Sequence, residues 1–280
     1  MPSVASLHVY PVKGAARMTV ERWPVDERGL RHDRRFMLIT ADNRFVSQRN
    51  CPKLALVRTA IEGDALLLAC TLGEVSVPLT LTNAQRVSAV VWDDSLECAL
   101  VSSAADDLFT RFLQLPCRLV WMPDDAARLT PSGRGDPRRR VSLADRAPVL
   151  LTTEASLEDL NTRLERGGAA RVPMDRFRPN IVVTGVASGL DDDWCAIAIG
   201  PTRFRVTNAC KRCQVVTIDQ ATGALQGAEP LRTLATYRRD GDSVAFGQHL
   251  LADAFGTIAV GDEIDVRAGR GETFPSCARV

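Results

Sequence analysis

Short apolar runs that end at turn residues fill most of this chain, and they constrain its fold more than any other feature. Residues 36–40 and 45–47 flank the turn Ala41-Asp42-Asn43-Arg44, which predicts a hairpin. Residues 54–61 and 65–70 predict a second hairpin, with Gly63 at its reversal. Further strands are predicted at 117–121, 149–151, 181–184, 196–199, 204–206, 215–218 and 264–266.

Two segments show the spacing of apolar residues that is typical of an amphipathic helix. The first follows Ser103, which can cap it with Asp106 three residues later. The second covers residues 154–166 and ends at Gly167-Gly168. Because strands and helices do not alternate as they do in βαβ units, the predicted class is α+β, β-rich, with a few helices.

The length of 280 residues exceeds the usual size of one domain, so we expect two domains or one large composite. The polar stretch at 123–140 is the predicted junction or a mobile lid. Its end, Arg138-Arg139-Arg140, lacks aromatic neighbours, and the net charge of the chain is only +1. We therefore expect a solvated loop and no nucleic-acid partner, and an anionic ligand would depend on a local cluster of bases.

The sequence contains no recognisable export signal or membrane anchor. Residues 1–8 lack a basic stretch followed by an apolar run, and no segment reaches about 18 uninterrupted apolar residues. We therefore expect a cytoplasmic protein without a membrane partner. Reduced thiols explain the eight cysteines better than a secreted disulfide framework does, although that alternative stays open.

The motif Cys210-Lys211-Arg212-Cys213 is the densest chemical signal, because its two cations favour the thiolate form of the neighbouring cysteines. Four interpretations remain open. Structural zinc would need a second pair of ligands, which the sequence lacks. A thioredoxin-like pair should open a helix, whereas Cys213 leads into the predicted strand at 215–218. Two inert buried thiols are possible, and so is one thiolate that binds a soft metal beside an anionic cofactor.

Three further clusters suit an anion. Lys13 precedes Gly14 at a predicted loop, where the backbone can approach a ligand closely. Arg34 and Arg35 stand at the head of an apolar strand, with Asp33 as an alternative partner. Phe177-Arg178-Pro179-Asn180 precedes another strand and adds an amide that can hydrogen-bond a heterocycle, while Asp175 and Arg176 could neutralise each other nearby.

Taken together, five ordered motifs resemble the MOSC-domain family, especially the branch of the mitochondrial amidoxime-reducing component and its bacterial relatives. The resemblance runs from about Val4 to Val266. Its motifs are Tyr10-Pro11-Val12-Lys13-Gly14, Asp33-Arg34-Arg35-Phe36-Met37, the helix from Glu154 to Asn161, Arg176-Phe177-Arg178-Pro179-Asn180-Ile181, and Cys210-Lys211-Arg212-Cys213 through to Thr222-Gly223.

This resemblance implies an N-terminal β-barrel-like domain at 1–120, packed against a C-terminal MOSC β-barrel at 121–270. A molybdenum cofactor, Mo-molybdopterin and not pyridoxal phosphate, would lie between them, with Cys213 as the metal ligand and catalytic residue. The resemblance implies the following cofactor-binding residues: Lys13, Gly14, Arg34, Asp145, Arg178, Asn180, Lys211, Arg212, Cys213 and His249. Gly14 departs from the animal members of the family, which have a hydroxyl residue there.

The implied activity is reduction of small N-hydroxylated compounds such as amidoximes and hydroxylamines. Cys277 stands alone near the end of the sequence and falls short of the four ligands of an iron-sulfur cluster. We therefore expect electrons from a separate ferredoxin-, flavin- or cytochrome-type partner. Two alternatives stay open, namely a protein that carries or delivers the cofactor or its sulfur without turnover, and a metal-free β-barrel binding module.

Overall fold

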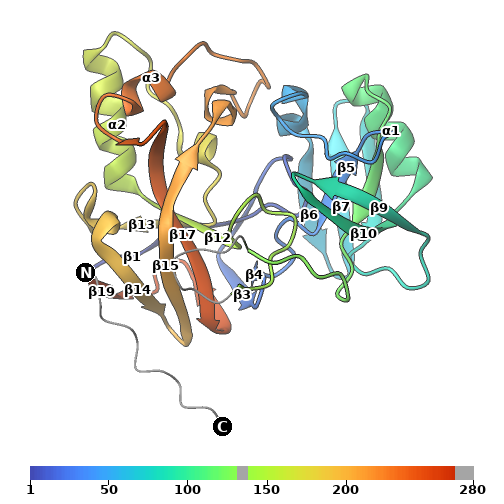
Figure 1. Cartoon of the computed structure of the whole chain (residues 1–280), viewed down its shortest axis with the longest axis horizontal. Helices are drawn as coiled ribbons and strands as arrows, with labels where there is room; N and C mark the ends of the chain where they lie inside the picture. Colours follow the sequence, from blue (N-terminus) through green and yellow to red (C-terminus); the bar gives the residue numbers. More distant parts are fainter. Residues whose placement is uncertain (131–137, 269–280) are drawn as a thin grey trace.

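The computed structural model describes residues 1–130 and 138–268, and its backbone forms two bodies that lie side by side (Figure 1). Cys277 and the centre of the predicted loop at 123–140 lie outside the described residues. Strands dominate both bodies, which confirms the predicted β-rich α+β class. Within the described ranges, no helix is both long enough and apolar enough to span a bilayer.

The larger body is built on a nine-stranded sheet with the order β19-β14-β15-β17-β12-β13-β1-β2, and β16 pairs with β17 off this path. Residues such as Leu151, Ile197 and Leu250 alternate into its core. The strands are β1 (Ser3–Val9), β2 (Met18–Val20), β12 (Val149–Thr153), β13 (Ile181–Thr184), β14 (Trp194–Ile199), β15 (Thr202–Arg212), β16 (Arg239–Asp240), β17 (Ser243–Ala254) and β19 (Ile264–Ala268).

The start of the chain belongs to this larger body. β1 pairs antiparallel with β13, so that Leu7 lies opposite Ile181. A three-stranded sheet next to it joins β18 (Gly256–Ala259), β3 (Arg22–Asp26) and β4 (Gly29–Leu30). The division of the chain at residues 120 and 121 stays a prediction.

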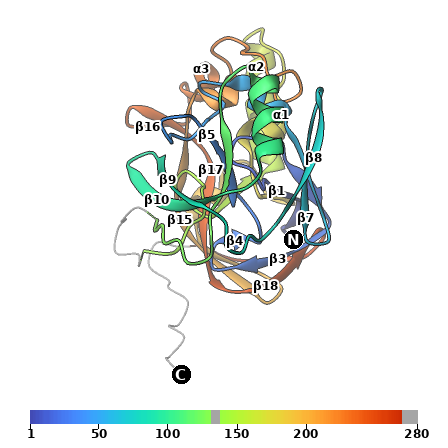
Figure 2. The ribbon, with the colours of Figure 1, turned by 90° about the vertical axis from the view of Figure 1, so that its right-hand side faces the viewer.

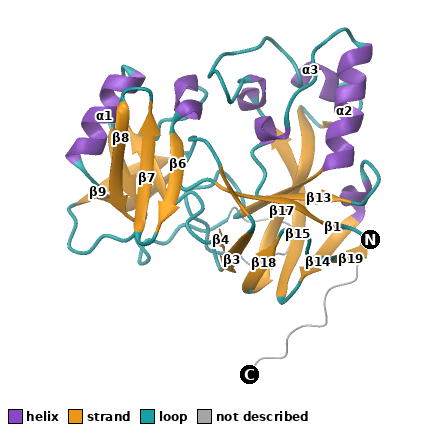
Figure 3. Cartoon of the chain, turned by 180° about the vertical axis from the view of Figure 1, so that it is seen from behind, coloured by secondary structure: helices purple, strands orange, loops and turns teal. Residues whose placement is uncertain are grey.

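The smaller body contains two sheets and one α-helix, α1 (Ser103–Leu113), which contacts β8 and β11. Figure 2 views this body with α1 toward the reader, and Figure 3 shows β6 to β8 from behind. One sheet has the order β5-β11-β10-β9 and the other β6-β7-β8. The strands are β5 (Phe36–Ile39), β6 (Arg58–Glu62), β7 (Ala65–Cys70), β8 (Gly73–Pro78), β9 (Arg86–Val91), β10 (Asp94–Leu100) and β11 (Arg118–Trp121).

The two predicted helices are present. Ser102, and not Ser103, caps α1 by accepting a hydrogen bond from the backbone N–H of Ala105. The second is α2 (Glu154–Arg166), which Thr153 caps. Because β12 and β13 pair in parallel, α2 completes one βαβ unit, which the sequence prediction did not include. A short α3 (Leu231–Leu234) contacts α2.

Three predicted strands are partly or wholly wrong. Residues 45–47 form no strand, and Phe45 makes only an isolated bridge to Ile39. Residues 52–56 form the 3-10 helix η1 (Pro52–Leu56), so the first strand of that hairpin begins only at Arg58. Residues 214–217 form the 3-10 helix η4 (Gln214–Thr217) in place of the strand predicted at 215–218. The hydroxyl of Thr217 donates to the carbonyl oxygen of Gln214, and this local bond favours the turn over extended backbone. Two more 3-10 helices are η2 (Met174–Phe177) and η3 (Leu190–Asp193).

Candidate functional site

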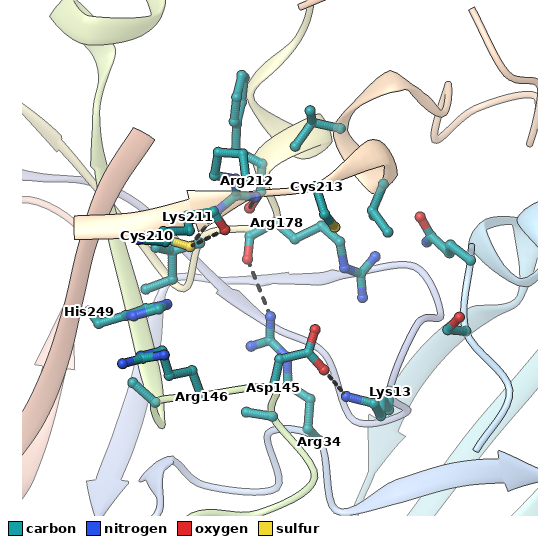
Figure 4. Close-up of a pocket in the computed structure, with 18 of the residues that line it drawn as sticks. Lys13, Arg34, Asp145, Arg146, Arg178, Cys210, Lys211, Arg212, Cys213 and His249 are labelled. Carbon is teal, nitrogen blue, oxygen red and sulfur yellow. Dashed lines mark hydrogen bonds and ion pairs between the residues drawn. The ribbon is translucent and has the colours of Figure 1, made fainter. Parts of the chain in front are cut away.

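One cavity between the two bodies brings together every residue that the family resemblance implied for the cofactor. Figure 4 labels eight of these ten residues. It measures about 530 Å³. The smaller body and the first loop of the chain contribute one wall, and β15, β17 and the segments that precede β12 and β13 contribute the other. The ten predicted residues in its lining are Lys13, Gly14, Arg34, Asp145, Arg178, Asn180, Lys211, Arg212, Cys213 and His249.

Arg34 and Arg178 occupy equivalent positions at the turns that precede β5 and β13. Both have left-handed backbone, with φ of 49° and 56°, a conformation that costs a non-glycine residue about 1–3 kcal/mol and is concentrated at functional sites. Their guanidinium carbons lie 4.2 and 4.4 Å from the ring centre of Tyr10. Arg34 also donates to the carbonyl oxygen of Arg178 over 3.2 Å, so the two cations are held together.

Arg178 forms no ion pair with any carboxylate of the described residues. Its guanidinium donates to the side-chain oxygen of Gln220 over 3.3 Å. Burial in the cavity lowers the pKa of Arg178 to about 10, which still leaves it cationic at neutral pH. A cation in such surroundings is costly without a counter-charge, so this position favours an anionic ligand. Arg34 differs from Arg178, because it forms an ion pair with Asp33, the alternative partner named in the sequence analysis.

Asn180 lines the cavity, but its amide is fully engaged with the protein. The side-chain oxygen accepts from Arg34 over 3.0 Å and from the backbone N–H of Leu150 over 3.1 Å. The amide nitrogen donates to the carbonyl oxygen of His8 and to Asp33. Asn180 therefore positions Arg34, and no free amide group is left to bind a heterocycle.

Lys13 and Asp145 form an ion pair across the cavity wall, and Lys13 also donates to the carbonyl oxygen of Leu143 over 2.8 Å. Burial opposes ionisation of Asp145, yet the charges of Lys13 and Arg49 outweigh it and hold the pKa of this carboxyl below its usual range. Gly14 follows with φ of 85°, and a Cβ there would lie 2.5 Å from Leu54. The left-handed backbone favours glycine, and any side chain there would have to displace the end of Leu54.

Cys213 stands at the end of β15, where the chain turns into η4. Its half-buried thiol accepts a hydrogen bond from Arg49 over 3.1 Å. The described residues contain no group of three His, Cys, Asp or Glu side chains that could hold a metal ion, which leaves the zinc interpretation without support there. Cys213 is a single soft donor in a cationic cavity.

Cys210 is a separate thiol on the same strand. Burial opposes its ionisation, but Arg212 and His249 outweigh that effect and lower the pKa of the Cys210 thiol to about 6. Arg212 donates to the sulfur over 2.8 Å, and the imidazole Nδ1 of His249 lies 3.3 Å from the amide nitrogen of Asn208. Three residues of extended backbone span roughly 10 Å, too far for a disulfide to Cys213. The thioredoxin-like interpretation therefore fails on distance, and the inert-thiol interpretation does not suit Cys210.

The two cations between these thiols differ in role. The side chain of Lys211 is 56% exposed at the cavity edge and pairs with Asp240 over 3.6 Å. Arg212 points inward and donates to the carbonyl oxygen of Phe177 over 2.7 Å. Outside the motif, Arg176 pairs with Asp219 and not with Asp175 as predicted, because η2 packs against η4.

The sequence analysis missed the wall formed by Phe45, Arg49 and Trp92. Arg49 lies 4.6 Å from the ring centre of Trp92, and the ring centres of Phe45 and Trp92 are 5.0 Å apart. The indole N–H of Trp92 donates to Asp145 over 3.1 Å. Only the turn between β9 and β10 marks Trp92 in the sequence, and nothing there links it to the cysteine motif.

Comparisons with known proteins assign both halves of the chain to one family. A model of the MOSC N-terminal beta barrel domain matches residues 1–116, and a model of the MOSC domain matches residues 138–265. The chain is 32% identical to "Mitochondrial amidoxime-reducing component 1" of Homo sapiens, over 94% of this chain and 82% of that protein. It is 29% identical to "Molybdenum cofactor sulfurase" of Solanum lycopersicum, over 87% of this chain but only 32% of that protein.

One solved structure that is similar along the whole chain is the YUAD protein from Bacillus subtilis. It covers 96% of this chain and 98% of its own, with a TM-score of 0.41 and 12% sequence identity. Likeness at that level says nothing about activity.

Proposed function

This chain belongs to the MOSC-domain family, as the resemblance of its motifs implied, and on that premise we propose that its cavity binds the molybdenum cofactor and that the protein reduces N-hydroxylated compounds. The observation that carries the proposal is the meeting of Arg34, Arg178 and Cys213 in one cavity. Two of these residues attract anionic groups, and the third is a soft metal donor.

The residues present fit this cofactor. Arg178 has no ion-pair partner among the described residues, so an anionic group of the cofactor supplies the counter-charge that the protein lacks. Lys13 and Arg212 add positive charge around the same space, and Asn180 holds Arg34 in place. Cys213 is the metal ligand, because its thiol lines the cavity and belongs to no cluster of metal-binding side chains within residues 1–130 and 138–268.

When bound, the molybdenum cofactor supplies the two electrons that break the N–O bond. The reaction consumes two electrons and two protons, and it forms one water with an amidine from an amidoxime or an amine from a hydroxylamine. Arg49 lies within hydrogen-bond distance of the Cys213 sulfur, so the same guanidinium orients the oxygen of a substrate there. A separate ferredoxin-, flavin- or cytochrome-type protein donates the electrons, and the protein acts in the cytoplasm.

Metal analysis combined with an activity assay tests this function. We expect about one molybdenum per chain in the purified protein and reduction of benzamidoxime with reduced viologen as an artificial donor. Cys213→Ser should abolish turnover and leave the thermal unfolding midpoint nearly unchanged. Cys195→Ser, at a half-buried thiol outside the cavity, is the matched control. A fully active Cys213→Ser protein would refute the ligand assignment.

The similarity to molybdenum cofactor sulfurase keeps a second function open, namely carriage or delivery of the cofactor or its sulfur. The same experiment separates the two functions. Stoichiometric molybdenum without reduction of any N-hydroxylated compound would favour the carrier. Absence of molybdenum would favour a metal-free binding module.

A further inference from the structure

The two ends of the cavity differ in chemistry. The end formed by Arg34, Arg178 and Arg212 is cationic and satisfies the needs of an anion. The opposite wall, which comes from the smaller body and its loops, carries the aromatic rings of Phe45 and Trp92. The anionic groups of a cofactor would bind the cationic end, and the two rings of this wall suit a flat, uncharged surface.

Trp92 is held in place although its backbone conformation is unfavourable for a residue other than glycine. It occupies the two-residue loop between β9 and β10, where Val91 pairs with Asp94. Its φ of 58° is a conformation for which such loops favour glycine. Three contacts fix the indole there, namely the hydrogen bond to Asp145, the guanidinium of Arg49 and the ring of Phe45. Backbone strain of this kind persists where the surroundings impose it, and it is concentrated at binding sites.

Arg49 connects this aromatic wall to the candidate metal ligand. Its guanidinium carbon lies 4.6 Å from the Trp92 ring centre, and one of its nitrogens lies 3.1 Å from the Cys213 sulfur. Trp92 is 39% exposed, so part of its surface is open to a ligand. A molecule whose polar end approaches Cys213 therefore meets an aromatic surface within the length of one arginine side chain.

We propose that Trp92, supported by Phe45, is a specificity-determining residue that binds the planar aromatic part of an uncharged substrate. The inference rests on the proposed reductase function and narrows its substrate class to conjugated N-hydroxylated compounds such as aryl amidoximes. Arg49 lies over the ring of Trp92 and Lys13 over the ring of Phe45, and these two cations disfavour a cationic substrate. Asp145 is a positioning residue for Trp92, because its carboxylate accepts the hydrogen bond of the indole N–H.

The kinetic test compares benzamidoxime with acetamidoxime, which share the reacting group and differ in the ring. In the molybdenum-loaded protein, Trp92→Gly should lower the ratio of kcat/KM for benzamidoxime to kcat/KM for acetamidoxime about tenfold. The main cause should be a higher KM for benzamidoxime. Trp92→Phe should keep most of the ratio. Trp23→Phe, at a tryptophan outside the cavity, should leave the ratio unchanged.

Because glycine suits the backbone at position 92, relief of strain should offset part of the contacts that Trp92→Gly removes, and the variant should fold with a thermal midpoint close to that of the parent. A drop in the ratio then reports lost contact and not misfolding.

A binding measurement separates failure of this inference from failure of the proposed function. Benzamide carries the ring without a reducible N–O bond, and acetamide is its aliphatic counterpart. Benzamide, more than acetamide, should change the tryptophan fluorescence of the purified protein, and the change should disappear in Trp92→Phe but survive in Trp23→Phe. If neither amidoxime is reduced, this titration alone decides the inference. Equal responses to both amides, or an unchanged kcat/KM ratio in an active Trp92→Gly protein, would overturn it.

Discussion

Arg49 donates a hydrogen bond of 3.1 Å to the sulfur of Cys213, although the two residues are 164 positions apart in the sequence. One comes from the loop after β5 and the other from the end of β15. The contact therefore joins the two bodies at the Cys213 sulfur, which we propose as the molybdenum ligand.

Arg49→Ala should reduce kcat/KM for benzamidoxime by about tenfold to a hundredfold, because a hydrogen bond to a charged group contributes about 1.5–3 kcal/mol. Molybdenum content should stay near one per chain, since other residues hold the cofactor. Steady-state kinetics and elemental analysis check both points. The control is Arg86→Ala, which removes an exposed ion pair with Asp125 far from the cavity. An unchanged kcat/KM would show that Arg49 does not serve the reaction.

Arg178→Gln should stabilise the cofactor-free protein but weaken its retention of the cofactor. Without cofactor, removal of a buried cation that lacks an ion-pair partner among the described residues should raise the thermal midpoint. Molybdenum retention after gel filtration should fall, because a charge-assisted contact to the anionic group is lost. A variant that loses stability and keeps its molybdenum would contradict both expectations.

Cys210 should react with iodoacetamide as a thiolate down to about pH 6, which mass spectrometry of its peptide can follow. Its pKa is lowered from 9.0 to about 6 in the folded protein, so its stabilising contribution is fully present above about pH 9. That contribution is lost as the pH falls through about 6. His249→Leu should move the reactivity profile to higher pH, since one of the groups that lower the pKa is removed.

Cys98 is the internal control for this measurement. Burial raises the pKa of the Cys98 thiol to about 12, so it should be alkylated only after unfolding. If Cys210 and Cys98 react at the same rate in the native protein at pH 7, the cavity does not favour the Cys210 thiolate.

Gly14→Ala should destabilise the protein by about 3 kcal/mol, the sum of left-handed backbone and a clash with Leu54. Gly63→Ala separates the two causes, because its φ is also positive while nothing lies within 4 Å of the added Cβ. That variant should cost only about 1–2 kcal/mol. Urea denaturation of both variants measures the difference, and equal losses would show that the contact with Leu54 relaxes without cost.

The sequence predicted the elements whose signals are local. Residues 154–166 carry an N-terminal cap, apolar spacing and a terminal glycine pair, and the helix has those bounds. Residues 215–218 show the limit of this reasoning. Their β-branched side chains resemble those of a strand, whereas the hydroxyl of Thr217 bonds back to Gln214 and closes a turn.

The candidate site divides in the same way. Arg34, Arg178 and Cys213 stand in motifs that resemble the family, so a sequence comparison suggests them. Arg49 and Trp92 reach the cavity only because the loop after β5 and the turn between β9 and β10 face the end of β15 across it, and no pattern near them encodes that contact. Likewise, the sequence shows Asn180 as an available amide, and only the structure shows its four partners.

The pairing of Leu7 with Ile181 sets an order of events during synthesis. During synthesis, β1 cannot pair with β13 until residues 181–184 have emerged from the ribosome, so one of its edges stays unpaired until then. The wall that contains β15 and β17 comes later still. The cavity is therefore complete only after β17 has been synthesised and has paired with β12 and β15.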